Sequence, residues 1–265
     1  MIWTSAQTAI VRKDMREAMS TRGVKVAMLV VPLIMALAIP IMFTIMACTL
    51  PAELGDFGAA VALMPIKFSV EDATRAAYYY LMNYMMPTFF IMIPVMASSV
   101  VSGSSIVGER ERHTLATLMY SPLTVKQLFT AKVAGAVVTA LIVTGMAFAA
   151  FLAVAVAGSM LVYGGFVLDI GIWLSLLLLI APSVSLAGVT VMVLASAKAR
   201  SFQEAQQYAA MLTVPLMLLM LLPQMLGMFL FNAPQLAIMG AAFLVLALIM
   251  LRIASARFTS EKLLK

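Results

Sequence analysis

The chain has 265 residues, of which 64% are hydrophobic and 11% are charged, and its formal net charge is +6. Soluble domains contain roughly 45 to 50% apolar residues, so the composition excludes a soluble protein and indicates an integral membrane protein. The positive charge does not require nucleic acid as a partner, because Lys and Arg beside membrane spans are normally retained on the cytosolic side. We therefore expect the lipid bilayer, and no nucleic acid, as its surroundings.

Residues 4–22 are expected to form an amphipathic helix at the membrane interface. Thr4 and Gln7 have the spacing of a capping box. The apolar face is predicted to contain Val11, Met15, Ala18 and Met19, opposite the basic residues 12, 13 and 16. This basic face could meet anionic headgroups or a partner protein, although a plain topogenic basic segment fits the pattern equally well. Gly23 is expected to allow the change of direction into the first span.

Six membrane spans are predicted, because each needs about 20 apolar residues and the chain has room for roughly six. We place them at residues 24–47, 85–107, 132–156, 172–195, 208–222 and 235–251. The expected fold class is therefore an all-α membrane protein with a single transmembrane domain. Pro32 and Pro40 are probable kinks in the first span, and tyrosines at 78–84 mark the membrane interface before the second.

The distribution of basic residues predicts how the spans are oriented. Fifteen of the 17 Lys and Arg fall in the segments that this layout puts on one side, and only Lys67 and Arg75 fall on the other. Basic residues are retained in the cytosol. We therefore predict a multi-pass protein of the cytoplasmic (inner) membrane with both termini cytosolic.

Small residues are concentrated near the end of the second span. Ser98, Ser99, Ser102 and Gly103 have small-xxx-small spacing, which permits close approach of helices or of two copies of the chain. Gly103 and Gly108 also have the glycine spacing of a phosphate-binding loop. Glu109 and Arg110 stand where such a loop requires Lys and then Ser or Thr, so no nucleotide site is expected here.

The polar stretch after this span predicts a short helix over residues 108–120. Glu109 and Arg112 are three positions apart and can pair on a helix. Leu115, Leu118 and Met119 recur at i, i+3 and i+4 and form one apolar face. Ser121-Pro122 ends the helix, and Thr124 and Gln127 have capping-box spacing at the start of the next. A second polar loop, 196–207, carries Ser201 and Glu204 with similar spacing.

An ordinary charged loop would explain the charges in 108–120, and a docking helix would also explain the apolar face. The stretch resembles the cytosolic coupling region of ABC-2 type exporter permeases, which commonly reads Gly-Glu-(Lys/Arg)-Glu-(Arg/Lys), a small residue, Thr-Leu and a Pro-containing turn. It departs from that pattern at His113, where Gly is frequent, and at Ala116, where an acidic residue is common. Residues 201–206, SFQEAQ, resemble the corresponding loop of the sodium-efflux-like branch.

The resemblance implies a permease subunit of an ATP-driven exporter. Such a subunit pairs, usually as a homodimer, with two ABC ATPase (nucleotide-binding) subunits, which hold the ATP and Mg. Carried onto this sequence, it implies ATPase docking by Glu109, Arg110, Glu111, Arg112, Leu115, Leu118, Met119, Ser201 and Glu204, and packing of the permease pair through Ser98, Ser99, Ser102 and Gly103.

The residues give no support for chemistry on this chain. His113 is the only histidine and Cys48 the only cysteine, and the later spans are predicted to lack the ionisable groups that proton- or ion-driven transporters usually carry. We expect no catalytic, cofactor-binding or metal site and no enzyme activity. The alternative function is a passive channel, scaffold or insertase without an ATPase. The cargo is hypothesised to be apolar or amphipathic, with sodium as the rival.

Overall fold

The structure is a computed structural model, and it describes residues 4–53, 73–111, 123–196, 201–208 and 233–257, together with single residues between 210 and 218. Throughout these ranges the regular elements are helices. Five of them are long and apolar enough to cross a membrane: Arg22–Thr49, Ala73–Glu109, Val125–Tyr163, Ile170–Ser196 and Ala233–Ser255. The protein is thus an all-α membrane protein. Most of the predicted fifth span, 208–222, lies outside the described residues, so the count of six stays a prediction.

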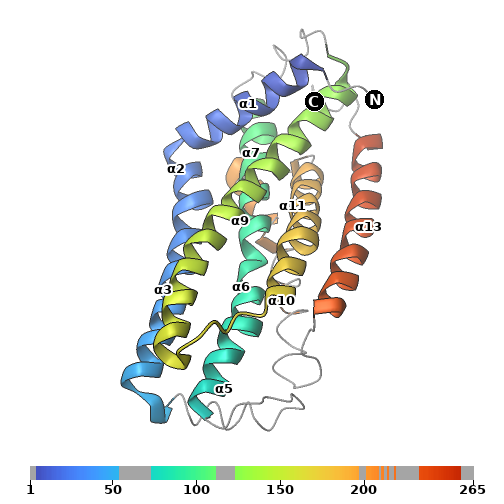
Figure 1. The fold of residues 1–265 in the computed structure, drawn as a ribbon. Coiled ribbons are helices and arrows are strands. Elements are labelled where there is room, and N and C mark those ends of the chain that lie inside the picture. The colour runs from blue at the N-terminus through green and yellow to red at the C-terminus, as the bar shows by residue number, and fades with distance from the viewer. Residues whose placement is uncertain are drawn as a thin grey trace.

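Helix α1 (Ser5–Ser20) lies across one end of the bundle, which we call the α1 end (Figure 1). The capping box of Thr4 and Gln7 is present at its start. The face that packs on the rest of the protein contains Gln7, Ile10, Asp14 and Ala18; of the predicted apolar face, Ala18 belongs to it. The chain bends at Thr21, whose backbone is extended. Gly23 lies within helix α2 (Arg22–Lys25), so the prediction of a bend at Gly23 is wrong.

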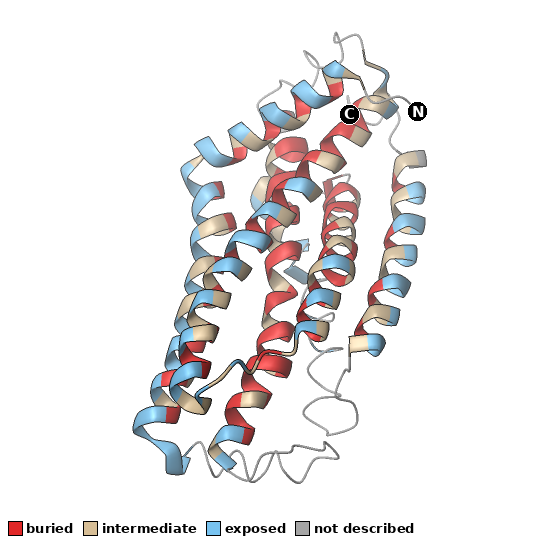
Figure 2. Ribbon diagram, viewed as in Figure 1, coloured by how far each residue is buried: buried red, intermediate tan, exposed pale blue. Residues whose placement is uncertain are grey.

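The first span continues from α2 through a π-helical turn, η1 (Val26–Val30), into α3 (Val31–Thr49). The next consists of α5 (Ala73–Tyr80), η2 (Leu81–Met85), α6 (Met86–Phe90) and α7 (Met92–Glu111). It begins twelve residues earlier than the predicted start, because the tyrosine-rich helix and the apolar run are one element. Its apolar stretch is 83% buried, against 17% for α13 (Ala233–Arg257). It is therefore the central helix of the bundle (Figure 2).

Helix α9 (Val125–Tyr163) is 39 residues long and starts at the predicted capping box of Thr124 and Gln127. It ends at Gly164, whose positive φ of 75° provides the left-handed cap. The following span consists of α10 (Ile170–Ser175), η3 (Leu176–Ile180) and α11 (Ala181–Ser196). Helix α7 packs chiefly against α11 and α9, α3 packs on α9, and α13 packs on α11. Figure 1 shows α7 and α11 ending, and α9 beginning, at the α1 end.

Each π-helical turn precedes a proline by two residues. Pro32 follows η1, Pro87 follows η2 and Pro182 follows η3. Proline has no N–H, and its ring clashes with the carbonyl four residues earlier. In all three turns the residue before the proline donates its N–H to the carbonyl five residues back, as Val31 does to Val26. The wider turn makes room for the ring, so each span continues without a break.

Candidate functional site

The structure describes three of the residues predicted to dock an ATPase: Glu109, Ser201 and Glu204. Arg110 and Glu111 belong to the last turn of α7, but their side chains are outside the described part. Arg112, Leu115, Leu118 and Met119 lie in residues 112–122, also outside it. Residues 108–111 continue the spanning helix α7, and the rest of the helix predicted over 108–120 lies outside the described residues.

Glu109 is buried inside the protein, with 2% of its surface exposed. The sequence predicted a pair with Arg112 and a place among the charges around a docking surface. Arg112 lies outside the described residues, so that pair stays a prediction. Among the described residues, Lys13 donates to Glu109 Oε1 at 2.6 Å and Lys132 donates to Glu109 Oε2 at 2.6 Å. Both carboxylate oxygens are thus satisfied by lysines of α1 and α9. We infer that Glu109 holds these helices together.

Lys132 is the centre of this cluster. It is 3% exposed, and besides Glu109 it donates to the backbone carbonyl of Ser105 at 2.9 Å and to Ser105 Oγ at 2.8 Å. These three acceptors match the three N–H groups of an ammonium. The sequence interpretation counts Lys132 as a cytosolic loop charge and expects no charge in the later spans; the structure corrects both points, because Lys132 lies on a spanning helix and is buried.

Asp14 joins the cluster through a hydroxyl. Ser105 Oγ donates to Asp14 Oδ2 at 2.7 Å, and Lys132 Nζ lies 3.8 Å from the same oxygen. Hydrogen bonds therefore run from Lys13 to Glu109, from Lys132 to Glu109, from Lys132 to Ser105 and from Ser105 to Asp14. Lys13 and Asp14 are neighbours on α1, so the chain of bonds leaves α1 and returns to it. We call these five residues the charge ring.

Local structure explains how the five side chains meet. Ser105 and Glu109 are four residues apart on α7 and so share one face. Val11 of α1 packs against Gly135 of α9, where an added Cβ would be in ordinary van der Waals contact, 3.5 Å from the Cα of Val11. Ile10 packs with Leu128 and Ala131 one turn away. The ring thus lies where α1 crosses the start of α9 beside the end of α7.

Burial raises the pKa of the Asp14 carboxyl above its ordinary value of 3.8, and the nearby Lys132 charge and the Ser105 hydrogen bond offset this only in part. Asp14 is 4% exposed, and its Oδ1 has no hydrogen-bond partner. For Lys13, burial lowers the pKa, but the hydrogen bond and charge of Glu109 outweigh it and the pKa is raised above 10.5. The ring contains two ammonium groups and two carboxyl groups, so with both acids ionised its formal charges cancel.

Carboxylate oxygens of Asp14, Glu17 and Glu109 all lie within 4.8 Å of one another. Such a group could hold a cation in principle. Here Lys132 occupies the space between Asp14 and Glu109 and already satisfies the inner oxygen of Glu109. A metal ion would have to displace that ammonium, so the donor set fits a resident lysine better than a metal.

Residues 201–208 pack on the other side of α7. Phe202 and Ala205 contact Val107 of α7 and Met192 of α11 in one apolar cluster. Gln206 Nε2 donates to the backbone carbonyl of Ser99 at 3.1 Å. Ser201 Oγ accepts from the N–H of Glu204 at 3.1 Å, which is the cap that the sequence predicts. The last turns of α7 are thus held between α1 and residues 201–208.

The small residues of α7 pack within the chain. Ser98, Ser99 and Ser102 are buried, with exposed fractions of 0, 4 and 1%. Gly103 faces Phe202, and a Cβ on Gly188 of α11 would lie 2.5 Å from Ser98 Oγ. The small side chains therefore let α7 and α11 approach closely. Two copies of the chain would have to meet through other residues, because this surface is already covered.

Sequence reasoning did not identify Asp14, Ser105 and Lys132 as site residues. Each of the three has a weak local signal in the sequence. Asp14 interrupts a basic run, Lys132 stands in an otherwise apolar stretch, and Ser105 precedes Glu109 by one helical turn. Nothing in the sequence indicates that these positions meet, since Asp14 and Ser105 are 91 residues apart.

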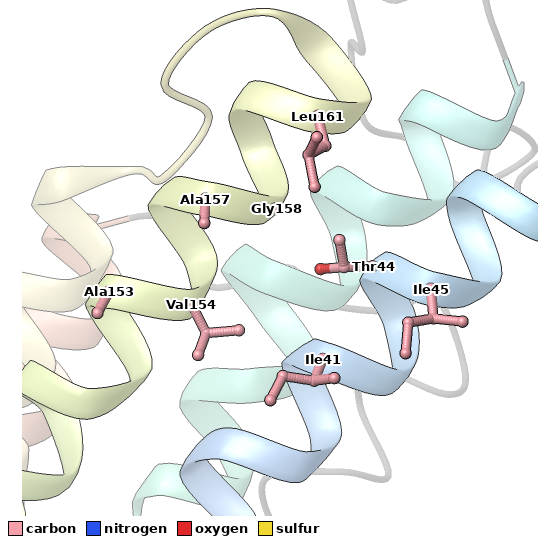
Figure 3. A pocket seen from close by; sticks show the side chains of 8 residues that line it. All are labelled: Ile41, Thr44, Ile45, Ala153, Val154, Ala157, Gly158 and Leu161. Atoms are coloured by element: carbon pink, nitrogen blue, oxygen red, sulfur yellow. The ribbon is translucent and has the colours of Figure 1, made fainter.

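An apolar groove lies between α3 and α9, towards the end opposite α1 (Figure 3). Its cavity volume is about 380 Å³, and it is lined by Ile41, Thr44, Ile45, Ala153, Val154, Ala157, Gly158 and Leu161. The hydroxyl of Thr44 already bonds to the carbonyl of Pro40 at 2.7 Å and lies 3.2 Å from the hydroxyl of Tyr78. The groove therefore presents apolar surface to whatever occupies it.

Five long apolar helices, a helix lying across one end and a buried charge cluster at that end define a multi-pass α-helical membrane protein. Residues 8–238 match the family model described as ABC-2 family transporter protein. The chain belongs to the ABC-2 transporter family, as its resemblance to ABC-2 type permeases predicted, and this family supplies the membrane permease subunits of ABC transporters. A search of curated proteins gave no significant match. The permease is a transport subunit and is not itself catalytic.

Proposed function

We propose that this protein is the permease subunit of an ABC exporter, driven by a separate ATPase subunit that binds ATP and Mg. The family match carries this proposal. The arrangement at the α1 end supports it, because α7 and α9 flank residues 112–122 and are clamped together there by Glu109 and Lys132. A partner that moved this segment would act on two spanning helices at once.

The α1 end faces the cytosol in this proposal, and the membrane is the cytoplasmic one. Basic residues support this orientation. Helices α1 and α2 expose four basic residues: Arg12, Arg16, Arg22 and Lys25. At the other end of the bundle, the first described turn of α5 carries a single basic residue, Arg75. Basic residues near the ends of spans are retained in the cytosol.

The docking element is proposed to be the stretch 108–120 predicted from the sequence, with Leu115, Leu118 and Met119 as its apolar face. Burying one leucine contributes roughly 1.5 to 3 kcal/mol, whereas charges at the rim of an interface act mainly on orientation and association rate. Two permeases and two ATPases are the expected assembly, by analogy with the family.

An apolar or amphipathic cargo is the substrate class that the described spans favour. The groove between α3 and α9 offers apolar side chains, and the charged residues of the described spans lie at the α1 end except for Arg75, which is at the opposite end. Sodium remains the rival substrate, because residues 201–206 resemble the sodium-efflux-like branch.

Co-purification with an ABC ATPase tests the proposal. The wild-type permease is expected to retain the ATPase in detergent, Leu118→Glu to release it, and Arg112→Ala, as the matched charge variant, to weaken it less. A wild-type permease that bound no ATPase under any condition would favour the passive channel, scaffold or insertase. Full binding by Leu118→Glu would move the docking role away from this helix.

A further inference from the structure

Among the residues of the charge ring, Asp14 is the one whose presence is least explained by a contribution to stability. It is 4% exposed, and one of its carboxylate oxygens is buried without a hydrogen-bond partner among the residues that the structure describes. A buried charge with unused acceptor capacity is unfavourable, and replacing a buried ionic group by an apolar one of similar size is often neutral or stabilising. The other acid, Glu109, has a lysine on each oxygen. Asp14 therefore calls for an explanation other than stability.

The rest of the contact between α1 and α9 leaves the position of α1 loosely specified. Among the described residues it includes a small cluster of Ile10, Leu128 and Ala131, and the packing of Val11 against Gly135. Apolar and small side chains of this kind pack without directional bonds. Apart from the ring, the bond from Gln7 Nε2 to the carbonyl of Gln127, 3.2 Å long, ties α1 to the first turn of α9.

The ring adds direction to this contact. Ser105 Oγ donates its one hydrogen to Asp14 and accepts from Lys132, so Asp14 is aligned with α7 and α9 together. Lys13, the next residue, grips Glu109 one turn further along α7. Two adjacent residues of α1 thus bond directly to Ser105 and Glu109 of α7. Lys132 of α9 bonds to the same two residues of α7, so the three helices are fixed together and both the rotation and the height of α1 are set.

We propose that Asp14 is a positioning residue, which holds α1 in one setting against the α7–α9 pair so that movement of residues 112–122 is passed to α1. From α1 the movement reaches the first span through the bend at Thr21. This inference rests on the proposed function in one respect: the ATPase subunit is what would move residues 112–122. The placement of α1 by Asp14 is independent of any ATPase.

Asp14→Leu removes the charge and both acceptor oxygens at similar volume. The Ser105 hydroxyl can then turn to a carbonyl of its own helix, as serines in helices commonly do. Asp14→Asn is the conservative variant, because its amide oxygen can still accept from Ser105. Glu17→Gln is the control: it neutralises another α1 carboxylate, one that is not a member of the ring, is 29% exposed and lies 3.8 Å from the ammonium of Lys13.

The first arm uses the permease alone in lipid nanodiscs. Spin labels at Ala9→Cys and Val138→Cys, both exposed positions, are introduced in a Cys48→Ala background, and their separation is measured by pulsed electron paramagnetic resonance. One narrow distance distribution is expected for the labelled protein with the wild-type charge ring and for its Glu17→Gln variant. Asp14→Leu is expected to broaden or split the distribution without lowering the thermal midpoint, and Asp14→Asn to restore much of it.

An unchanged distribution in Asp14→Leu would overturn the proposal. A clear fall in its thermal midpoint, or its failure to accumulate in membranes, would also overturn it, because Asp14 would then be an ordinary stabilising contact. A broad distribution in Asp14→Asn together with a narrow one in Asp14→Leu would contradict the role of the Ser105 hydrogen bond.

The second arm adds the ATPase subunit that co-purifies with the wild-type permease. Asp14→Leu is expected to bind it like wild type but to reduce permease-stimulated hydrolysis about fivefold, the lower end of typical coupling effects. If the wild-type permease binds no ATPase, the proposed function fails while the first arm still decides the placement of α1. If Asp14→Leu binds and keeps full stimulation, the coupling role of Asp14 is overturned.

Discussion

Lys132 and Lys13 bind the same carboxylate from opposite sides, yet their surroundings differ. The side chain of Lys132 is 2% exposed and that of Lys13 is 47% exposed. Water can replace the ammonium of Lys13 but not that of Lys132. The two lysines therefore provide a matched pair for asking how far burial decides the value of an ionic contact.

Lys132→Met should destabilise the protein by about 3 to 5 kcal/mol, because it leaves Glu109 and Asp14 buried near each other without the shared cation. Lys13→Met should cost only about 0 to 1 kcal/mol, as expected for a partly exposed pair. Denaturant unfolding of the purified variants in detergent measures both. Equal losses would mean that burial does not set the strength of these contacts.

Asp14 also makes stability depend on pH. Its pKa in the folded protein is raised above 3.8, so in the range from 3.8 up to that raised value the folded state binds more protons than the unfolded state. Stability should therefore fall as pH rises through this range. The slope should be smaller in Asp14→Asn, in which this proton is absent. The check is thermal unfolding of both proteins over the acidic range; identical slopes would show that Asp14 is not the source of the proton uptake.

At the scale of elements, the crossing of α7 and α11 depends on the absence of a side chain at Gly188. An added Cβ would lie 2.5 Å from Ser98 Oγ and 3.2 Å from the backbone carbonyl of Val95. The hydroxyl can turn away, but the backbone cannot move without shifting the helix.

Gly188→Ala should therefore destabilise the protein by about 1 to 3 kcal/mol. Gly145→Ala on α9 is the control, since a Cβ there has nothing within 4 Å and alanine favours a helix over glycine by roughly 1 kcal/mol. The two variants should thus shift the unfolding midpoint in opposite directions. A neutral Gly188→Ala would show that α7 and α11 can separate slightly without loss.

The sequence predicts these elements well where the signal is local. The capping boxes at Thr4 and Thr124 depend on residues three apart, and both are present. The sequence predicted the apolar face of α1 but not the polar contacts of its buried face, where Gln7 and Asp14 bond to α9 and α7. The charge ring joins positions 23 to 96 residues apart, and no pattern along the chain specifies which of them meet.

At the scale of the whole molecule, the asymmetry of charge predicts which end faces the cytosol. Arg12 is exposed on α1, the helix before the first span, and Glu53 is exposed just after the far end of that span. In a Cys48→Ala background, Glu53→Cys should react with a membrane-impermeant thiol reagent in intact cells, and Arg12→Cys should react only after the membrane is opened. The reverse pattern would invert the orientation, and reaction of both in intact cells would exclude the six-span layout.

The π-helical turns of the spans change the direction in which later side chains project around the helix axis. A π-helical turn is equivalent to one extra residue in an α-helix, and each residue advances the helix by about 100°. The faces before and after η2 are therefore offset by about that angle relative to an uninterrupted helix. Deleting one residue from Leu81–Met85 would rotate the two parts of this span against each other. With its tyrosines held at one end, the span would turn Ser98 away from α11 and Ser105 away from Lys132, so one inserted residue brings both contacts into phase.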